Sequence, residues 1–260
     1  MIELAKVSLR RGEAQILDGA FVRIEPGQVV LISGPSGMGK TSLLSLIGGF
    51  VTADSGEVRV FQHDVARMRS TSTALLRRKL AFVPQELELI GDMSALANVR
   101  LALEVCGVGR QAAQSRAIQA LTAVDMGEQL RRKVCELSTG QRRRVSLARG
   151  LVRDAEIVVA DEPSNDLDAD RVLQMVGIIE DKREAGAAII MASNDPRLLT
   201  HAQQPGWRHL ALCGGQLIPG DMRSLFERPQ QEPQAAELQD ASPLTNLVPF
   251  PVSAALRTLP

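Results

Sequence analysis

A glycine-rich segment near the start of the chain has the residue types and spacing of a phosphate-binding loop. It reads Gly34-Pro35-Ser36-Gly37-Met38-Gly39-Lys40-Thr41 and matches GxxxxGK[ST] at every fixed position. Backbone N–H groups of such a loop turn inward around phosphate oxygens, and the N-terminus of the following helix adds partial positive charge. We therefore predict that residues 34–42, Ser42 included, bind nucleotide phosphates. Lys40 would reach the β- and γ-phosphates and Thr41 would ligate Mg²⁺.

Two adjacent acids, Asp161 and Glu162, follow the apolar run at residues 157–160. A carboxylate at the end of a buried strand can hold Mg²⁺ directly or through water, and we assign that role to Asp161. We expect Glu162 to point to the other side of the strand end and to orient an attacking water molecule. Without the phosphate loop, a pair of solvated acids would explain the same residues equally well.

The elements that would position these residues alternate along the chain. Short apolar runs predict buried strands, and segments with helical spacing predict helices between them. Strands that alternate with helices imply a mostly parallel sheet with helices on both faces. The stretch from about 86 to 151 contains only helical patterns, so we predict a helical subdomain inserted between two strands. The predicted strands are 29–33, 58–61, 80–83, 157–161, 187–192 and 208–213, and the predicted helices are 41–47, 94–106, 111–124 and 167–185, with Ser94 as an N-cap and Gly186 at a helix end.

Composition narrows the class of protein. The chain has 260 residues, with 30 Lys+Arg and 30 Asp+Glu, so a strongly cationic nucleic-acid binder is excluded and we expect no nucleic-acid partner. Its three cysteines are isolated from one another, which excludes a CxxC-based zinc ribbon and disfavours a disulfide framework. No charge-free apolar run reaches the roughly 20 residues that a spanning helix needs, so a membrane role would require a partner.

The last part of the chain differs in composition from the rest. Residues 227–260 hold six of the 13 prolines together with several glutamines, a composition typical of a linker or a disordered tail. We therefore predict one domain over residues 1–220 and a tail over residues 221–260. The apolar residues within 241–256 leave open the alternative that this segment docks on the domain or on a partner.

The segment Leu137-Ser138-Thr139-Gly140-Gln141 lies about 20 residues before Asp161. In order with the phosphate loop, Gln85, the acidic pair and Asp168, it resembles the ATP-binding subunit of ABC transporters over residues 2–219. Among these subunits the chain is most similar to the FtsE, LolD and MacB type, and FtsE-like is the preferred branch.

The resemblance implies a P-loop NTPase (RecA-like) fold that also contains a small antiparallel β subdomain. It implies a head-to-tail dimer, homomeric or heteromeric, which encloses ATP between subunits. Ser138, Gly140 and Gln141 of one subunit would contact ATP bound to the other, together with Asp168. Gln85 would contact Mg²⁺ or the attacking water. The helical subdomain would dock on a transmembrane partner, FtsX-like or a permease, at the cytoplasmic face of the membrane.

Four positions depart from the family pattern. Residues 7–12 lack the usual adenine-stacking aromatic, so Arg10 or Arg11 could stack there instead, or could be solvated. Thr139 stands where glycine is common and would be strained if φ were positive. Residues 164–166 read Ser-Asn-Asp where Thr-Gly-Asn is frequent. Asn194 takes the place of the switch histidine, and it can donate one hydrogen bond to a γ-phosphate oxygen or water but cannot become cationic.

Two hypotheses follow from these departures. The first is a working but slow ATPase that drives a membrane partner, or signals to it, in cell division, lipoprotein release or export. The second is an ATP-binding switch with little turnover, because losing one preorganised group at such a site costs on the order of 10²–10³ in rate. A nucleoside kinase would share the phosphate loop but not the segment 137–141. The two basic runs at 131–133 and 142–144 are expected to be solvated helix faces, with a partner or anionic lipid as the alternative.

Overall fold

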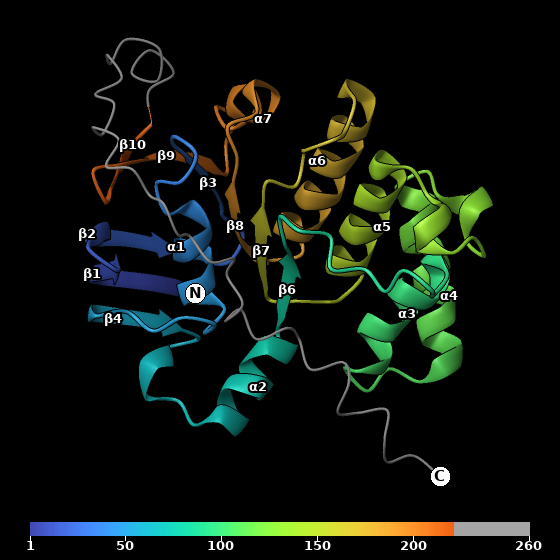
Figure 1. Cartoon of the computed structure of the whole chain (residues 1–260), viewed down its shortest axis with the longest axis horizontal. Helices are drawn as coiled ribbons and strands as arrows, with labels where there is room; N and C mark the ends of the chain where they lie inside the picture. The colour runs from blue at the N-terminus through green and yellow to red at the C-terminus, as the bar shows by residue number, and fades with distance from the viewer. Residues whose placement is uncertain (221–260) are drawn as a thin grey trace. The chain divides into compact units, whose positions relative to one another are not determined.

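The computed structural model describes residues 1–220, and the predicted tail lies outside the described residues. A six-stranded sheet with the order β10-β9-β3-β8-β7-β6 forms the centre of this part (Figure 1). Its neighbouring strands are parallel except for the antiparallel pair β9–β10. The strands are β3 (Val29–Ser33), β6 (Leu80–Val83), β7 (Ile157–Asp161), β8 (Ala188–Ala192), β9 (Trp207–Cys213) and β10 (Gln216–Pro219). Because β3, β7 and β8 are buried along their whole length, their sequences are apolar except for Ser33 and Asp161 at the ends of β3 and β7.

Helices cover both faces of this sheet, as predicted. Helix α1 (Lys40–Ile47) packs on one face, where its leucines join Val30, Ile32 and Val159 in one hydrophobic core. The opposite face carries α5 (Thr139–Leu151), α6 (Ala169–Glu184) and α7 (Pro196–His201) over a second core. Alternate residues of the central strands therefore point into different cores, which fixes the register of the strands.

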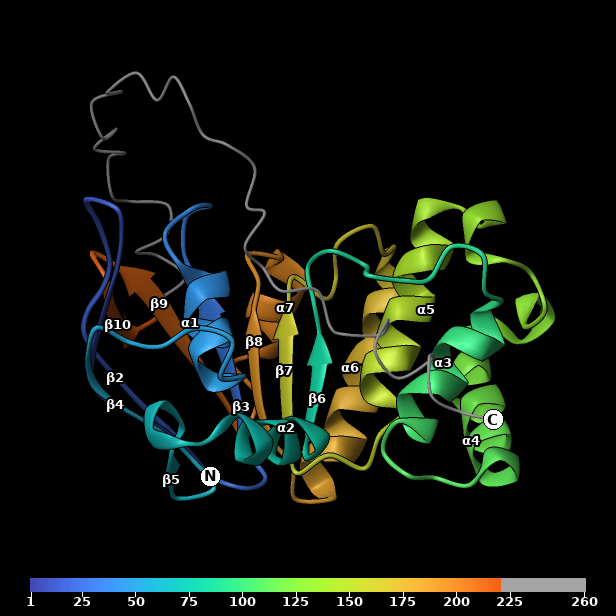
Figure 2. The ribbon, with the colours of Figure 1, turned by 60° about the horizontal axis from the view of Figure 1, so that its bottom comes forward.

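A second, antiparallel sheet packs against α1 and completes the first core (Figure 2). Its order is β2-β1-β4-β5, and its strands are β1 (Ile2–Arg11), β2 (Ala14–Ile24), β4 (Ser55–Val60) and β5 (His63–Asp64). The short helix η1 (Val65–Arg67) and α2 (Ser70–Arg78) follow this sheet. This is the small β subdomain that the family resemblance implied.

The helical subdomain lies between β6 and β7, and its core is separate from the other two. It contains α3 (Ala95–Glu104), α4 (Arg110–Ala123), the short helices η2 (Gly127–Gln129) and η3 (Val134–Glu136), and α5. Ser94 is the N-cap of α3, since its hydroxyl accepts a hydrogen bond from the N–H of Ala97 at 3.1 Å. Helix α5 faces two cores, because Val145 packs in the subdomain while Leu151 packs on the sheet. Across residues 1–220, no helix is both long and apolar enough to cross a membrane.

Candidate nucleotide-binding site

The phosphate loop connects β3 to the start of α1 at one edge of the central sheet. Residues 35–38 are exposed at the top of the loop, whereas Gly34 and Lys40 are buried beneath it. Gly39 has φ +99, and a Cβ there would collide with the Ile16 side chain of β2. Only glycine allows both this backbone conformation and this close approach, so the loop can turn sharply into the helix. Thr41, in the first turn of α1, is exposed.

Lys40 is folded back across the loop. Its Nζ donates a hydrogen bond to the Gly34 carbonyl at 2.7 Å and lies 3.8 Å from Oε1 of Glu162. The side chain is only 7% exposed. The ammonium group therefore lies between the loop carbonyls and an acidic side chain, at the position where the sequence predicts phosphate binding.

Asp161 lies at the end of β7 and is 2% exposed. Burial raises the pKa of its carboxyl, while a hydrogen bond from the Thr41 hydroxyl and the charge of Lys40 lower it. Its Oδ1 is buried and has no hydrogen-bond partner. A buried carboxylate oxygen without a partner, beside a threonine hydroxyl, suits a hard divalent cation such as Mg²⁺. Residues 1–220 contain no group of three acidic, His or Cys side chains able to hold a metal.

Glu162 adopts φ +44, which is unusual for a residue other than glycine. Its backbone N–H still continues the β7–β8 ladder by donating to the Ala192 carbonyl at 2.8 Å. Its Oε2 accepts a hydrogen bond from the Ser193 hydroxyl, whereas the Asp161 carboxylate accepts one from Thr41. Both carboxylates lie near the Lys40 ammonium.

Asn194 also lies beside the phosphate loop, on the segment that follows β8. Its Oδ1 accepts a hydrogen bond from the Gly34 N–H at 2.9 Å, and its Nδ2 donates to the Gly34 carbonyl at 2.8 Å. The carboxamide thus pairs with both polar groups of Gly34 and extends the β3–β8 ladder by one side chain. Asn194, predicted to contact phosphate, therefore lies against the first residue of the loop that would hold it.

Two buried residues at this edge of the sheet were not predicted as part of the site. Arg143 is 4% exposed, and its guanidinium donates to the carbonyls of Pro84 and Gln85. Burial lowers the pKa of Arg143, and nearby acids including Asp166 raise it. The expectation that residues 142–144 form a solvated face is therefore wrong for Arg143. Ser193 is fully buried and donates a hydrogen bond to Glu162. The only sequence signal for Ser193 is its place directly after the apolar strand β8, where it is followed by Asn194.

Gln85 follows β6, the strand beside β7, and its side chain is exposed at the same edge of the sheet as Asp161. Its carbonyl is held by Arg143 at 3.0 Å. This position is consistent with the metal or water contact predicted for Gln85.

The segment 137–141 forms the start of α5. Ser138 and Gln141 make a capping box, in which the Ser138 hydroxyl accepts from the Gln141 N–H at 3.2 Å and the Gln141 side chain accepts from the Ser138 N–H at 3.0 Å. Thr139 is the first helical residue and does not have a positive φ, so the backbone strain considered for this position is absent. Asp168 is the N-cap of α6. Within residues 1–220, no hydrogen bond or ion pair links Ser138, Gly140, Gln141 or Asp168 with residues 34–42.

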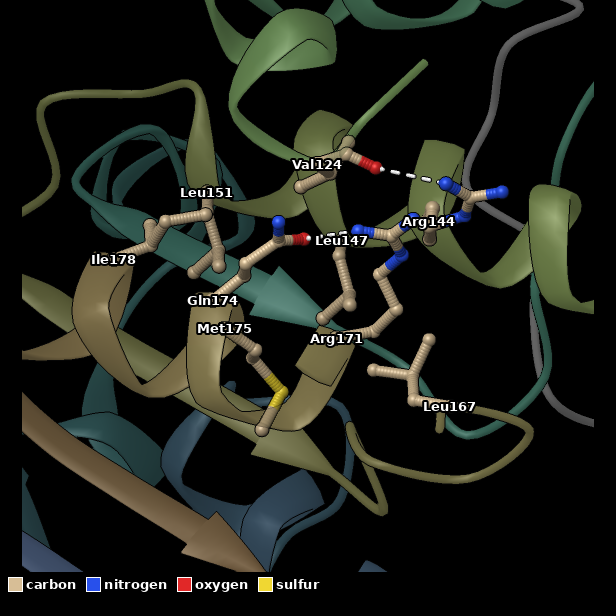
Figure 3. Close-up of a pocket in the computed structure, with 9 residues that line it drawn as sticks. All are labelled: Val124, Arg144, Leu147, Leu151, Leu167, Arg171, Gln174, Met175 and Ile178. Carbon is tan, nitrogen blue, oxygen red and sulfur yellow. Dashed lines mark hydrogen bonds between the residues drawn. The ribbon is translucent and has the colours of Figure 1, made fainter. Parts of the chain in front are cut away.

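A small pocket between α5 and α6 is separate from this site (Figure 3). It has a volume of about 10 Å³, which is room for about one water molecule, and its walls are mostly apolar. Arg144 of α5 and Arg171 of α6 flank it, and both form ion pairs with the Asp125 carboxylate at the end of the α4 segment. The pocket therefore marks a packed contact between the helical subdomain and α6.

Comparison with known proteins agrees with this geometry. The family model described as ABC transporter matches residues 3–165. An uncharacterized ABC transporter ATP-binding protein of Mycobacterium bovis is 34% identical over 78% of this chain and 61% of its own length. The macrolide export ATP-binding/permease protein MacB of Campylobacter jejuni is 35% identical over 78% of this chain and 32% of its own length. The chain thus spans about three fifths and one third of these two relatives, respectively.

Solved structures show the same fold. A dimeric ATP-binding cassette in a post-hydrolysis state, bound to ADP and Pi, superposes with a TM-score of 0.77 and is 26% identical, covering 85% of this chain and 98% of that one. A dimeric bacterial ABC transporter cassette gives a TM-score of 0.76 at 28% identity, covering 84% of this chain and 96% of that one. With the family match, the phosphate loop and the paired strand-end acids, these likenesses show that the chain belongs to the ABC transporter family.

Proposed function

We propose that the chain binds ATP with Mg²⁺ and hydrolyses it slowly as the ATP-binding subunit of an ABC-type membrane complex. The observation that carries this proposal is the convergence of Lys40, Asp161 and Glu162 at one edge of the sheet. A buried ammonium, a carboxylate with an unpartnered oxygen and a second carboxylate are the groups that phosphoryl transfer to water requires.

Each residue has a separate task in this proposal. The loop N–H groups and Lys40 bind the phosphates, while Thr41 and Asp161 hold Mg²⁺, with Gln85 as a further ligand to the metal or to water. Bound Mg²⁺ would neutralise charge on the phosphate oxygens. Glu162 orients the attacking water and accepts its proton, because its carboxylate lies beside Lys40 and, by inference, beside the terminal phosphate.

A dimer would complete the site. Ser138 and Gly140 make no hydrogen bond with the phosphate loop of their own chain, yet Ser138 is exposed at the N-terminus of a 13-residue helix. A helix N-terminus favours an anion, so this surface suits the terminal phosphate bound by a second subunit. The dimeric cassettes that match this chain support the arrangement.

A transmembrane partner is the third part of the proposal. The matching MacB protein is named as an ATP-binding/permease protein, and this chain spans one third of its length. We infer that this subunit works on a permease-like partner at the cytoplasmic face of the membrane. The MacB name supports the export branch, and the FtsE-like role in cell division stays a prediction from the sequence resemblance.

The decisive experiment measures ATP binding by calorimetric titration. Lys40→Ala should abolish binding, because it removes the only side-chain cation that lies within the described loop. Lys79→Ala is the matched control, since Lys79 forms an ion pair with Glu156 on another part of the surface. Unaltered ATP affinity in Lys40→Ala would refute the phosphate site.

An ATP-binding switch with little turnover is the second candidate function. The observation in its favour is Asn194, whose two polar groups are both engaged by Gly34. Phosphate release at saturating ATP, measured beside ATP-dependent dimerisation, separates the candidates. The ATPase predicts both phosphate release and dimerisation, whereas the switch predicts dimerisation alone.

A further inference from the structure

We propose that Ser193 is a positioning residue that holds Glu162 in its working orientation. This inference rests on the proposed function, in which Glu162 accepts a proton from water. Ser193 is the first residue after β8 and is fully buried. Its Oγ donates to Oε2 of Glu162 at 3.1 Å, and the other carboxylate oxygen lies 3.8 Å from Lys40. Each oxygen of Glu162 therefore has its own neighbour.

The direction of the Ser193 hydrogen bond is set by its surroundings. The Asp195 N–H donates to Ser193 Oγ at 3.2 Å and occupies one acceptor position of the hydroxyl. Ser164 Oγ lies 3.4 Å from the same atom, and it also hydrogen-bonds the Asp195 carboxylate. A hydroxyl has one proton to donate, and Glu162, if ionised, can only accept. The single proton of Ser193 is thus directed at Glu162.

The backbone of both residues is fixed, so this contact is preorganised. Ser193 N–H donates to the Ile32 carbonyl at 2.9 Å, and Glu162 N–H donates to the Ala192 carbonyl at 2.8 Å. Both bonds extend ladders between β3, β7 and β8, which are buried along their whole length. Asp195 is in turn the N-cap of α7 and an ion-pair partner of Arg197. Ser193 therefore does not need to reorganise in order to orient Glu162.

The role of Ser193 differs from that of Lys40. In the proposed reaction Lys40 binds phosphate, so its attraction for Glu162 is shared with the nucleotide. The Ser193 hydroxyl is buried behind Glu162 and has no such competitor. Loss of this hydroxyl should therefore leave ATP binding intact while the carboxylate becomes free to rotate.

The test compares kcat and KM for ATP in the full chain. Ser193→Ala should lower kcat by about 10- to 100-fold, part of the 10²–10⁴ that a positioned base supplies, and leave KM within about twofold. Ser193→Thr retains the hydroxyl and should restore most of the rate. Ser193→Cys keeps the size but donates weakly, so it should lower kcat even if Ser193→Ala does not fold. Ser146→Ala removes another fully buried hydroxyl and should keep the parent rate.

A double-mutant cycle separates positioning from packing. In the Glu162→Gln background, Ser193→Ala should have little further effect on kcat, because the two residues act as a unit. Parent-like kcat in Ser193→Ala or Ser193→Cys, or full additivity with Glu162→Gln, would overturn the inference and leave the proposed function standing. Absence of phosphate release by the parent chain would refute hydrolysis and this inference together.

Discussion

Replacing Asn194 by histidine should weaken ATP binding and raise the turnover number. The carboxamide pairs with the Gly34 N–H at 2.9 Å and with the Gly34 carbonyl at 2.8 Å. An imidazole ring cannot supply a donor and an acceptor side by side to one residue, so Asn194→His loses at least one of these hydrogen bonds. Gly34 begins the phosphate loop, and a less ordered loop binds ATP more weakly.

The size of the affinity loss follows from the two hydrogen bonds. A neutral hydrogen bond contributes about 0.5–1.5 kcal/mol net, and the exposure of Asn194 places these two at the lower end. A loss of about 1 kcal/mol corresponds to an increase of about fivefold in the Kd for ATP. The turnover number should nevertheless rise at least several-fold, since histidine at the switch position can become cationic and exchange a proton.

The assay combines ATP titration with phosphate release at saturating ATP, using Asn194→Ala as the control. Alanine removes the pairing with Gly34 and supplies no ring, so it should weaken ATP binding as much as histidine does without raising kcat. Parent-like affinity in both variants would refute the contribution of the Asn194–Gly34 pairing to the loop. Unchanged kcat in Asn194→His at saturating ATP would show that position 194 does not face the γ-phosphate.

Three further predictions concern stability. Burial raises the pKa of the Asp161 carboxyl, so its charge destabilises the fold. Asp161→Asn should therefore raise the melting temperature by about 2–4 °C for each kcal/mol of unfolding free energy gained. The difference in melting temperature between variant and parent should shrink as the pH falls through that pKa, and a constant difference would contradict this. Burial also lowers the pKa of His209, whose ring contacts the Ser33 hydroxyl. The free energy of unfolding should therefore fall on acidification below about pH 6.5. His209→Gln should reduce the slope of unfolding free energy against pH in this range, and an identical slope would refute the prediction. Ser138→Ala should destabilise the chain by about 1 kcal/mol in denaturant unfolding through loss of the capping box, and an unchanged midpoint would argue against it.

The sequence predicts the central strands because they are buried on both faces. Strands β3, β7 and β8 are apolar up to their last residues, and their predicted ranges agree with the structure to within one residue. The antiparallel strands β1 and β2 have one exposed face and register shifts, including one around Lys6, where φ is positive. Their charged, irregular alternation hides them from an apolar-run criterion. Of that sheet, the residue pattern predicted only the strand at 58–61, which overlaps β4.

The site could be predicted to the level of residue identity, but the orientation of its side chains could not. The order of Lys40 and the acids along the chain follows from loop and strand-end rules. Glu162 has a left-handed φ, which no adjacent residue type signals. Arg143 lies between Arg142 and Arg144 in the sequence, and only the fold determines which arginine of the three is buried.

Two features that are unfavourable for folding argue that the strand-end acids serve a ligand. Asp161 has a buried oxygen without a partner, and Glu162 holds a backbone conformation that costs about 1–3 kcal/mol. Acids kept only for stability would be paired or solvated, because an unpaired buried carboxylate destabilises a fold. Both features occur at consecutive residues beside Lys40, at the edge of the sheet where the phosphate loop begins. Binding of Mg²⁺ and phosphate would use both groups, so the same geometry that weakens the chain alone should stabilise its complex with ATP.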